Sequence, residues 1–254
     1  MMNVIEVNKL VTKYGARVIH NELTFNIQKG EIFVILGGSG CGKSTLLKHL
    51  SRLLMPSSGQ ILIDGTDVTF LHESSLQEAM RPVGFMFQSG ALFGSLTLLE
   101  NVAVPLFKFT KLDKETVKAI SRVKLGMVGL GGFEGYYPHE ISGGMKKRAG
   151  VARAMALDPK ILLLDEPSAG LDPISADELD DLILGLNRAL GITFVIVTHE
   201  LQSIFKVAQR VIMLGRGNIL AEGDPNLLKD SEKPWVSDFF NRRGKFKQYL
   251  TSNP

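Results

Sequence analysis

The hydrophobic and polar positions change their period several times along the chain, and these changes predict its strands and helices. In residues 22–30 apolar side chains alternate at Leu23, Phe25 and Ile27, which is typical of a half-buried antiparallel strand. Residues 31–36 instead form a continuous apolar run that ends in glycines, the pattern of a buried parallel strand. The pattern therefore predicts an antiparallel layer together with a parallel core.

Further strands are predicted by the same two patterns. Short apolar runs in residues 83–88, 160–167 and 192–200 are typical of core strands. Alternation on both sides of a glycine-containing turn predicts two hairpins, one over residues 59–68 and one over residues 210–223.

Helix signals replace the strand pattern between about residues 89 and 157. Thr97 and Glu100 have the spacing of a capping box, and Asp113 can cap a following helix. A later helix, between two core strands, opens at Asp172. Together these elements predict an α/β fold with an inserted helical subdomain.

Composition narrows the class of protein. The chain has 254 residues, long enough for one large domain or a core with a subdomain, and its net charge of +3 is too small to indicate nucleic acid as a partner. Its single cysteine excludes an internal disulfide framework and fits a reducing compartment. The N-terminus carries no apolar region of a signal peptide, and no apolar run reaches the length of a membrane span. We expect a cytosolic protein that docks on a membrane protein.

Residues 141–150 read Ile-Ser-Gly-Gly-Met-Lys-Lys-Arg-Ala-Gly and contain a serine followed by two glycines. Adjacent glycines cost backbone entropy and pack nothing, so Gly143 and Gly144 indicate a close approach to another group. The residues after Ser142 predict a helix, whose first N–H groups and positive dipole end suit an anion.

Residues 37–45, Gly-Gly-Ser-Gly-Cys-Gly-Lys-Ser-Thr, follow a predicted buried strand and open a predicted helix. Glycines in this pattern let backbone N–H groups surround the phosphates of ATP, Lys43 can reach the β and γ phosphates, and Ser44 can bind Mg²⁺. Cys41 is interpreted as a small loop residue rather than a reactive thiol. The predicted phosphate-binding residues are Gly37, Gly38, Ser39, Gly40, Cys41, Gly42, Lys43, Ser44 and Thr45.

Polar residues follow three of the other predicted core strands. Asp165 and Glu166 end one of them; Asp165 is placed to hold Mg²⁺ through water, and Glu166 to polarise the attacking water. Gln88 follows a second strand and suits a Mg²⁺ or water contact, while His199 follows a third and can hydrogen-bond the γ-phosphate. The predicted catalytic residues are Lys43, Glu166 and His199, and the predicted metal ligands are Ser44, Gln88 and Asp165. The remaining histidines, His20, His49, His72 and His139, are interpreted as ordinary surface residues.

From about residue 4 to residue 225 the chain resembles the ATPase subunits of ABC transporters, with every motif in family order. The resemblance implies these assignments: Tyr14 stacks on adenine, Gln88 forms the Q-loop, Ser142-Gly143-Gly144 forms the signature, residues 168–172 form the loop that crosses the dimer, and His199 is the switch histidine. It also implies that the signature binds the γ-phosphate held by a second copy, so that each ATP site is completed in trans.

The resemblance further implies the fold and the domain organisation. We expect a P-loop NTPase of the ABC ATPase type, with a RecA-like, mainly parallel core and an antiparallel β layer formed by residues 1–88 and 158–225. A helical subdomain is expected over about residues 89–157, and residues 226–254 form a C-terminal extension. In that extension Val236, Phe239 and Phe240 predict a helix packed on its own domain. Its basic residues Arg242, Arg243, Lys245 and Lys247 suit either anionic lipid or the sister subunit.

One branch of the family matches two short stretches. The signature ends in Met145 where the family usually has glutamine, and a thioether cannot make the hydrogen bonds of an amide. "SGGM" followed by basic residues, together with residues 87–93, is similar to the ATPases of MCE-associated lipid transporters of the lipid-asymmetry type. That similarity implies a permease in the bacterial inner membrane, an MCE-domain lipid-binding protein, accessory subunits and a phospholipid cargo.

Three other functions share parts of this pattern. ABC importers of amino acids or ions have all the general motifs. Soluble ABC proteins that act on ribosomes or DNA usually have two nucleotide domains or a long coiled-coil insertion, and neither is predicted here. Intact Lys43, Asp165, Glu166 and His199 argue against a non-catalytic binding module.

Overall fold

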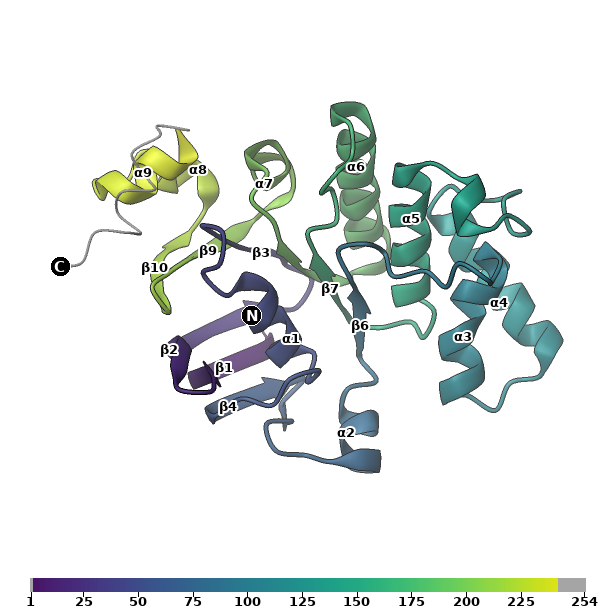
Figure 1. Ribbon diagram of the computed structural model, residues 1–254, viewed down its shortest axis with the longest axis horizontal. Coiled ribbons are helices and arrows are strands. Elements are labelled where there is room, and N and C mark those ends of the chain that lie inside the picture. Colours follow the sequence, from purple (N-terminus) through teal and green to yellow (C-terminus); the bar gives the residue numbers. More distant parts are fainter. Residues whose placement is uncertain (1, 242–254) are drawn as a thin grey trace. The chain divides into compact units, whose positions relative to one another are not determined.

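The computed structural model describes residues 2–241. The described chain forms two compact units, one of residues 2–80 with 193–241 and one of residues 81–192. Each unit combines strands and helices (Figure 1), so the predicted α/β class is confirmed. The basic residues Arg242, Arg243, Lys245 and Lys247 lie outside the described residues.

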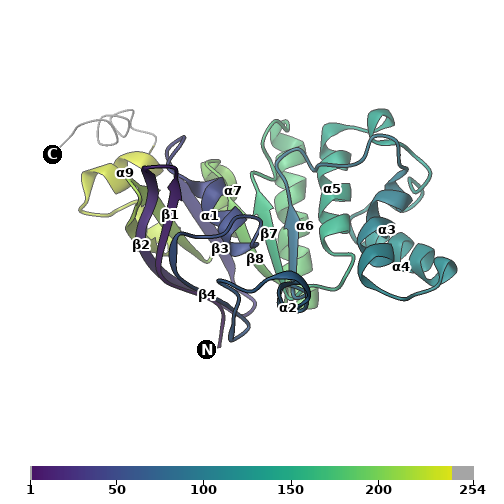
Figure 2. The same cartoon turned by 60° about the horizontal axis from the view of Figure 1, so that its bottom comes forward.

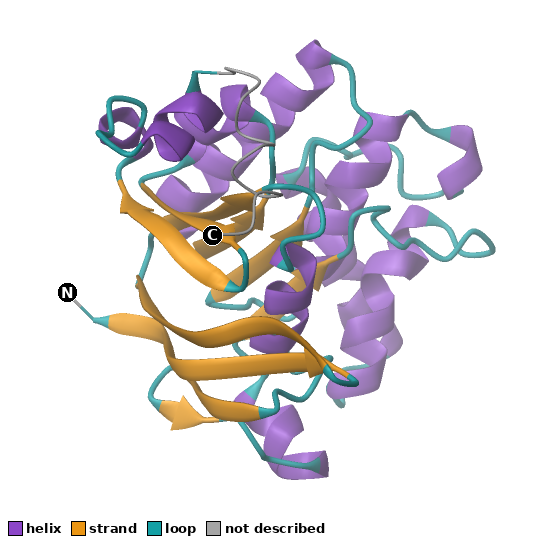
Figure 3. Cartoon of the chain, turned by 60° about the vertical axis from the view of Figure 1, so that its left-hand side comes forward, coloured by secondary structure: helices purple, strands orange, loops and turns teal. Residues whose placement is uncertain are grey.

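The first unit contains the antiparallel layer that the alternating pattern predicts, visible as a layer of orange strands in Figure 3. Its order is β2-β1-β4-β5. The strands are β1 (Asn3–Tyr14), β2 (Arg17–Gln28), β4 (Ser58–Ile63) and β5 (Thr66–Asp67). Leu23, Phe25 and Ile27 of β2 are buried as predicted, because alternate side chains of a strand face the same side of a sheet.

The same unit contains a second group of strands in the order β10-β9-β3-β8. They are β3 (Ile32–Gly37), β8 (Thr193–Val197), β9 (Arg210–Gly215) and β10 (Asn218–Gly223). The central strand, β3, is parallel to both β8 and β9 and all six of its residues are buried, whereas β10 pairs antiparallel with β9. Both the buried parallel strand and the final hairpin are therefore confirmed.

Five helices complete the described part of this unit. They are α1 (Lys43–Leu50), α2 (Glu73–Ala79), α7 (Leu201–Val207), α8 (Pro225–Leu228) and α9 (Pro234–Phe240). Helix α9 buries Val236 and Phe240, as its apolar face predicts. Helix α2 was not predicted, and the reason is that none of its residues is buried, so its sequence has no periodic apolar face.

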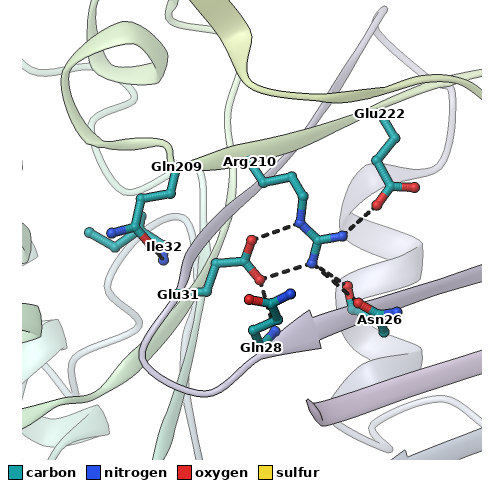
Figure 4. A network of polar contacts seen from close by, with 7 residues as sticks. All are labelled: Asn26, Gln28, Glu31, Ile32, Gln209, Arg210 and Glu222. Carbon is teal, nitrogen blue, oxygen red and sulfur yellow. Dashed lines mark hydrogen bonds and ion pairs between the residues drawn. The ribbon is translucent and has the colours of Figure 1, made fainter. Parts of the chain in front are cut away.

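A network of polar side chains links strands from both sheets of the first unit (Figure 4). The guanidinium of Arg210, at the start of β9, donates to both carboxylate oxygens of Glu31 at 2.7 and 2.9 Å and also donates to Glu222 of β10. It donates to the carbonyl of Asn26 in β2 at 2.7 Å and lies 4.9 Å from the ring centroid of Phe33. A single arginine thus connects β2, β3, β9 and β10.

The second unit contains two parallel strands and most of the helices predicted for the middle of the chain. They are β6 (Val83–Met86), β7 (Ile161–Asp165), α3 (Leu98–Phe109), α4 (Lys114–Met127), the short 3₁₀-helix η1 (Pro138–Glu140), α5 (Gly143–Ala154) and α6 (Pro173–Leu190). Helices α3 and α4 lie side by side, and α5 lies next to them (Figure 2).

The helix caps of this unit are those that the sequence predicts. Thr97 and Glu100 form the capping box of α3, Asp113 accepts two backbone hydrogen bonds at the start of α4, and Asp172 does the same for α6. Within residues 2–241, no helix combines the length and the hydropathy that a membrane crossing requires.

Candidate functional site

The phosphate-binding loop lies between β3 and α1, as predicted. Gly42 is the N-cap of α1, with φ 101° and no side chain to cap the helix. Lys43 begins the helix, and its ammonium donates to the carbonyls of Gly37 at 3.0 Å and Gly38 at 3.1 Å. The lysine is therefore folded over the loop at the positive end of the helix dipole, an arrangement that suits a phosphate.

Two glycines of the loop are required by close packing. A Cβ at Gly37 would lie 2.4 Å from the carbonyl oxygen of Leu214, and a Cβ at Gly42 would lie 2.4 Å from Nε2 of His20. Since both glycines also have positive φ values, a side chain at either position would strain the backbone as well.

His20 lies beneath the loop, and this corrects its interpretation as a surface residue. Its side chain is fully buried, Nδ1 lies 2.7 Å from the hydroxyl of Thr12, and Nε2 lies against Gly42 without reaching hydrogen-bond geometry. Burial lowers the pKa of His20 to about 4, so the ring is neutral near pH 7.

His49 is buried as well, which corrects a second surface interpretation. The exposed fraction of His49 is 4%, its Nδ1 lies 3.0 Å from the carbonyl oxygen of Leu54, and burial lowers its pKa. His72 and His139 are exposed, as predicted. The sequence alone gave no sign of this difference, because whether a single histidine is buried depends on the sheet packed over it.

Three other predicted residues belong to the first unit. Tyr14 ends β1 with 54% of its surface exposed, as a side chain that stacks on a base must be. His199 follows β8 by two residues and is exposed, with Nε2 3.6 Å from a carboxylate oxygen of Glu200. Burial raises the pKa of the Cys41 thiol, which fits its interpretation as an unreactive loop residue.

The two acids predicted to act on the metal and the water lie at the end of β7 in the second unit. Asp165 is the last residue of the strand and Glu166 follows it; their exposed fractions are 6% and 8%. Glu166 has φ 47°, an uncommon value for a residue with a side chain. Such strained positions cluster at functional sites.

Gln88 follows β6 by two residues and is joined to Glu166 through a residue that the sequence analysis missed. The ammonium of Lys147, in α5, donates to the carbonyl of Gln88 and, at 3.3 Å, to the carbonyl of Glu166. The second unit thus brings the Q-loop candidate, the candidate base and the signature helix together around one lysine. A signal existed, because Lys147 shares a helical face with Gly150 and Val151, which are both buried.

The signature serine and glycines open helix α5. Ser142 is the N-cap and accepts a hydrogen bond from the backbone N–H of Met145 at 3.2 Å. A Cβ at Gly143 or Gly144 would meet its nearest described neighbours, on Leu171 and Ser175, at 3.4–3.5 Å, an ordinary contact distance. Packing among the described residues therefore does not require these glycines.

The predicted metal ligands are all oxygen donors: the hydroxyl of Ser44, the amide of Gln88 and the carboxylate of Asp165. Within residues 2–241, histidine, cysteine and acidic side chains form no cluster of three or more that could hold a metal by itself. This composition fits Mg²⁺, which proteins usually hold through one or two carboxylates together with substrate phosphates and water. The P-loop and His199 belong to one unit, and Gln88, the signature and the two acids belong to the other.

Comparisons with known proteins agree with this set of residues. The profile described as ABC transporter matches residues 20–169. The "Probable ribonucleotide transport ATP-binding protein mkl" of Mycobacterium tuberculosis is 44% identical over 94% of this chain and 67% of that protein. The "Intermembrane phospholipid transport system ATP-binding protein MlaF" of Haemophilus influenzae is 41% identical over 93% of this chain and 90% of that protein.

The fold agrees as well. The dimeric, post-hydrolysis state of the ATP-binding cassette MJ0796, bound to ADP and Pi, matches with a TM-score of 0.79 and 31% sequence identity. The match covers 87% of this chain and 98% of the cassette. Sequence and fold thus identify the same family.

Proposed function

Because the chain belongs to the ABC transporter family, as one of its ATP-hydrolysing subunits, we propose that it powers a permease that moves phospholipid at the bacterial inner membrane. The proposal of a phospholipid cargo is supported by the similarity to the phospholipid transport ATP-binding protein of Haemophilus influenzae, which extends over nine-tenths of both proteins. We place the chain on the cytoplasmic face of that membrane, bound to the permease, with an MCE-domain lipid-binding protein and accessory subunits as further partners.

The proposed nucleotide site begins at the phosphate-binding loop. Backbone N–H groups are presented to the phosphates by the loop glycines Gly38 and Gly40 and by the first turn of α1. Lys43 exchanges its hydrogen bonds to two loop carbonyls for contacts with the β and γ phosphates. The exposed ring of Tyr14 stacks on the adenine. Ser44, Gln88 and Asp165 would hold Mg²⁺, which would neutralise phosphate charge when bound.

Hydrolysis is assigned to the acid after β7. Glu166 accepts a proton from the attacking water, Gln88 orients that water, and His199 donates a hydrogen bond to the γ-phosphate. The low exposure of Glu166 reduces competition from bulk water, which favours proton transfer to a fixed carboxylate.

A second copy of the chain completes each nucleotide site. Ser142, Gly143 and Gly144 open a helix whose glycines are not required by packing among the described residues, so the approaching group is proposed to be the γ-phosphate held by the sister subunit. ATP binding closes the dimer, hydrolysis reopens it, and the permease follows the two states.

The permease contact is proposed for the segment after Gln88. Phe93 is 52% exposed beneath the guanidinium of Arg153, which lies 5.9 Å from its ring centroid, whereas Leu106 further along is buried core. An exposed aromatic residue beside the Q-loop suits a short apolar helix of the permease.

A charge at this surface tests the contact. We expect Phe93→Asp to abolish co-purification with the membrane proteins while the thermal midpoint of the isolated chain stays within about 3 °C of the parent, because an exposed side chain contributes little to stability. Phe70→Asp, at a residue with a similar exposed fraction of 55% in the other unit, is the matched control and should leave co-purification intact. Loss of folding in Phe93→Asp would instead assign Phe93 to the core.

Cargo identity is tested by the material that the transporter carries. The full chain is purified in detergent with the membrane proteins that bind it, and the bound small molecules are extracted and identified by mass spectrometry. We expect phospholipid, and we expect phospholipid vesicles to raise the ATPase rate of the complex. Since the relative from Mycobacterium tuberculosis is named for ribonucleotide transport, stimulation by ribonucleotides without bound lipid would replace the proposal with that cargo class.

A further inference from the structure

We propose that Lys147 is a positioning residue that couples the signature helix to the Q-loop and to the catalytic acid of its own chain. The inference rests on the roles proposed above for Gln88 and Glu166. The ammonium of Lys147 donates to the backbone carbonyl of Gln88 and, at 3.3 Å, to the backbone carbonyl of Glu166. One side chain of α5 thus fixes the backbone after β6 and after β7.

The lysine is buried, which makes its two acceptors essential. Only 7% of Lys147 is exposed, and a buried ammonium without partners is strongly destabilising. Burial lowers the pKa of Lys147, while the nearby charges of Glu166 and Asp165 oppose that change.

The contact to Glu166 acts on its backbone. Glu166 has φ 47°, a conformation that costs free energy in a residue with a side chain, so it needs support from its surroundings. Lys147 supplies that support through the carbonyl oxygen. By holding the backbone of Glu166, the ammonium helps to fix the position of the residue proposed to accept the proton.

Lys147 also links this position to the other nucleotide site. It lies about one helical turn after Gly143 and Gly144, the residues proposed to meet the γ-phosphate of the sister subunit. A rigid helix transmits a shift at its first turn to a side chain one turn later. Engagement of the sister's ATP by the signature would thus reach Gln88 and Glu166 through the Lys147 hydrogen bonds.

The test replaces the ammonium while preserving the volume of the side chain. In the full chain purified with its membrane partners, we expect Lys147→Met to lower kcat for ATP hydrolysis about 10- to 100-fold, the effect of losing a hydrogen bond to a buried charged donor. KM for ATP should change less than about threefold, because the P-loop is untouched. Lys147→Arg keeps a donor and should recover at least part of kcat.

A matched control separates positioning from stability. Lys124 is also buried in the second unit, with 4% of its surface exposed, and pairs with Asp158, which precedes β7 and so is not among the residues that follow the strands. Lys124→Met should lower the thermal midpoint while kcat at a temperature well below it stays within about twofold of the parent. If Lys124→Met lowers kcat as much as Lys147→Met does, or if Lys147→Met leaves kcat unchanged, the proposal is wrong.

A double variant separates this inference from the proposed role of Glu166. With Glu166→Gln already present, Lys147→Met should slow the residual hydrolysis by a smaller factor than it slows the parent, because only its effect through Gln88 remains once Glu166 is replaced. If Glu166→Gln and Lys147→Met together lower the rate by the product of their separate factors, the coupling between Lys147 and Glu166 is contradicted even if Glu166 is the base. If Glu166→Gln alone hydrolyses ATP at the parent rate, the proposed base is wrong. If Lys147→Met does not fold, the same comparisons are made with Lys147→Gln, which retains a shorter donor.

Discussion

At the scale of single residues, Glu166 combines three properties that suit a general base. It follows the buried strand β7, its exposed fraction is 8%, and its φ of 47° is uncommon for a residue with a side chain. Asp165, beside it, is the proposed metal ligand. The two adjacent carboxylates are thus proposed to have separate roles.

Replacing Glu166 by glutamine tests this assignment. Glu166→Gln keeps the volume of the side chain and removes its basicity, so ATP hydrolysis should slow by about 10²- to 10⁴-fold while ATP affinity is retained. Steady-state phosphate release measures the first quantity and nucleotide titration measures the second. Glu78→Gln, at an exposed position in α2, should hydrolyse ATP at the parent rate. An ATPase rate within a few-fold of the parent would assign the base elsewhere.

His20 gives the fold a dependence on acid. Its pKa is about 4 in the folded chain and near 6.5 when unfolded, so the unfolded chain binds more protons between these values. Its contribution to stability is therefore complete above about pH 6.5 and is lost as the pH falls towards 4, amounting to about 2–3 kcal/mol. We expect the urea midpoint to fall over that range. His20→Asn should flatten the fall, whereas His72→Asn, at an exposed position, should follow the parent curve.

The residue scale also shows what the sequence could not predict. The phosphate-binding loop, the acids after β7 and the caps of α3, α4 and α6 were predicted because each depends on local order of residues. The burial of His20 and the contacts of Lys147 depend on which elements pack around them, and a single sequence does not contain that information. Periodicity places Lys147 on the same helical face as Val151, but it does not show what the ammonium contacts.

At the scale of elements, strands were predicted better than short helices. Strand β3 is buried along its whole length and β2 alternates, so each leaves a pattern in the sequence. Helix α2 buries none of its residues, so it leaves no such pattern in the sequence. The polar network around Arg210 was also missed, because its members come from four separate strands and the loop before β3.

The Arg210 network should contribute measurably to stability. Glu31 is 8% exposed, and Arg210→Met would leave its carboxylate without the guanidinium that donates to both of its oxygens. We expect the free energy of unfolding to fall by about 2–4 kcal/mol, the usual cost of removing one partner from a buried ion pair. Urea denaturation with an unchanged m value would measure it. Arg188→Met, at an exposed position in α6, should change stability by less than about 0.5 kcal/mol, and an equal loss in both variants would show that the network is not the cause.

At the scale of the whole molecule, the proposed function requires two copies. Gly143 and Gly144 open α5 at positions where a Cβ would meet described neighbours only at ordinary contact distances. The loop around Lys43 and the signature are therefore proposed to meet across the dimer. If so, a lesion in one motif and a lesion in the other should complement each other when they lie in different copies.

A mixed dimer tests this arrangement. One copy carries Lys43→Ala and the other carries Gly144→Asp, with Glu166→Gln in both so that bound ATP is trapped rather than hydrolysed. The aspartate adds a carboxylate where the phosphate should lie, so repulsion and bulk both oppose closure. A Cβ at Gly144 meets Ser175 at 3.4 Å, which leaves the variant chain able to fold. In the trans arrangement, one site collects both lesions and the other pairs an intact loop with an intact signature.

The observable is the amount of ATP held per dimer after unbound nucleotide is removed. We expect one tightly held ATP in the mixed dimer, two when only Glu166→Gln is present, and none in either homodimer that also carries a loop or signature lesion. If each chain completed its own site, both sites of the mixed dimer would carry a lesion and neither would hold ATP. An intact loop faces an intact signature in the mixed dimer only when the signature of one copy serves the loop of the other. An empty mixed dimer would therefore contradict the trans site, provided that both variant chains unfold at the same temperature as the parent.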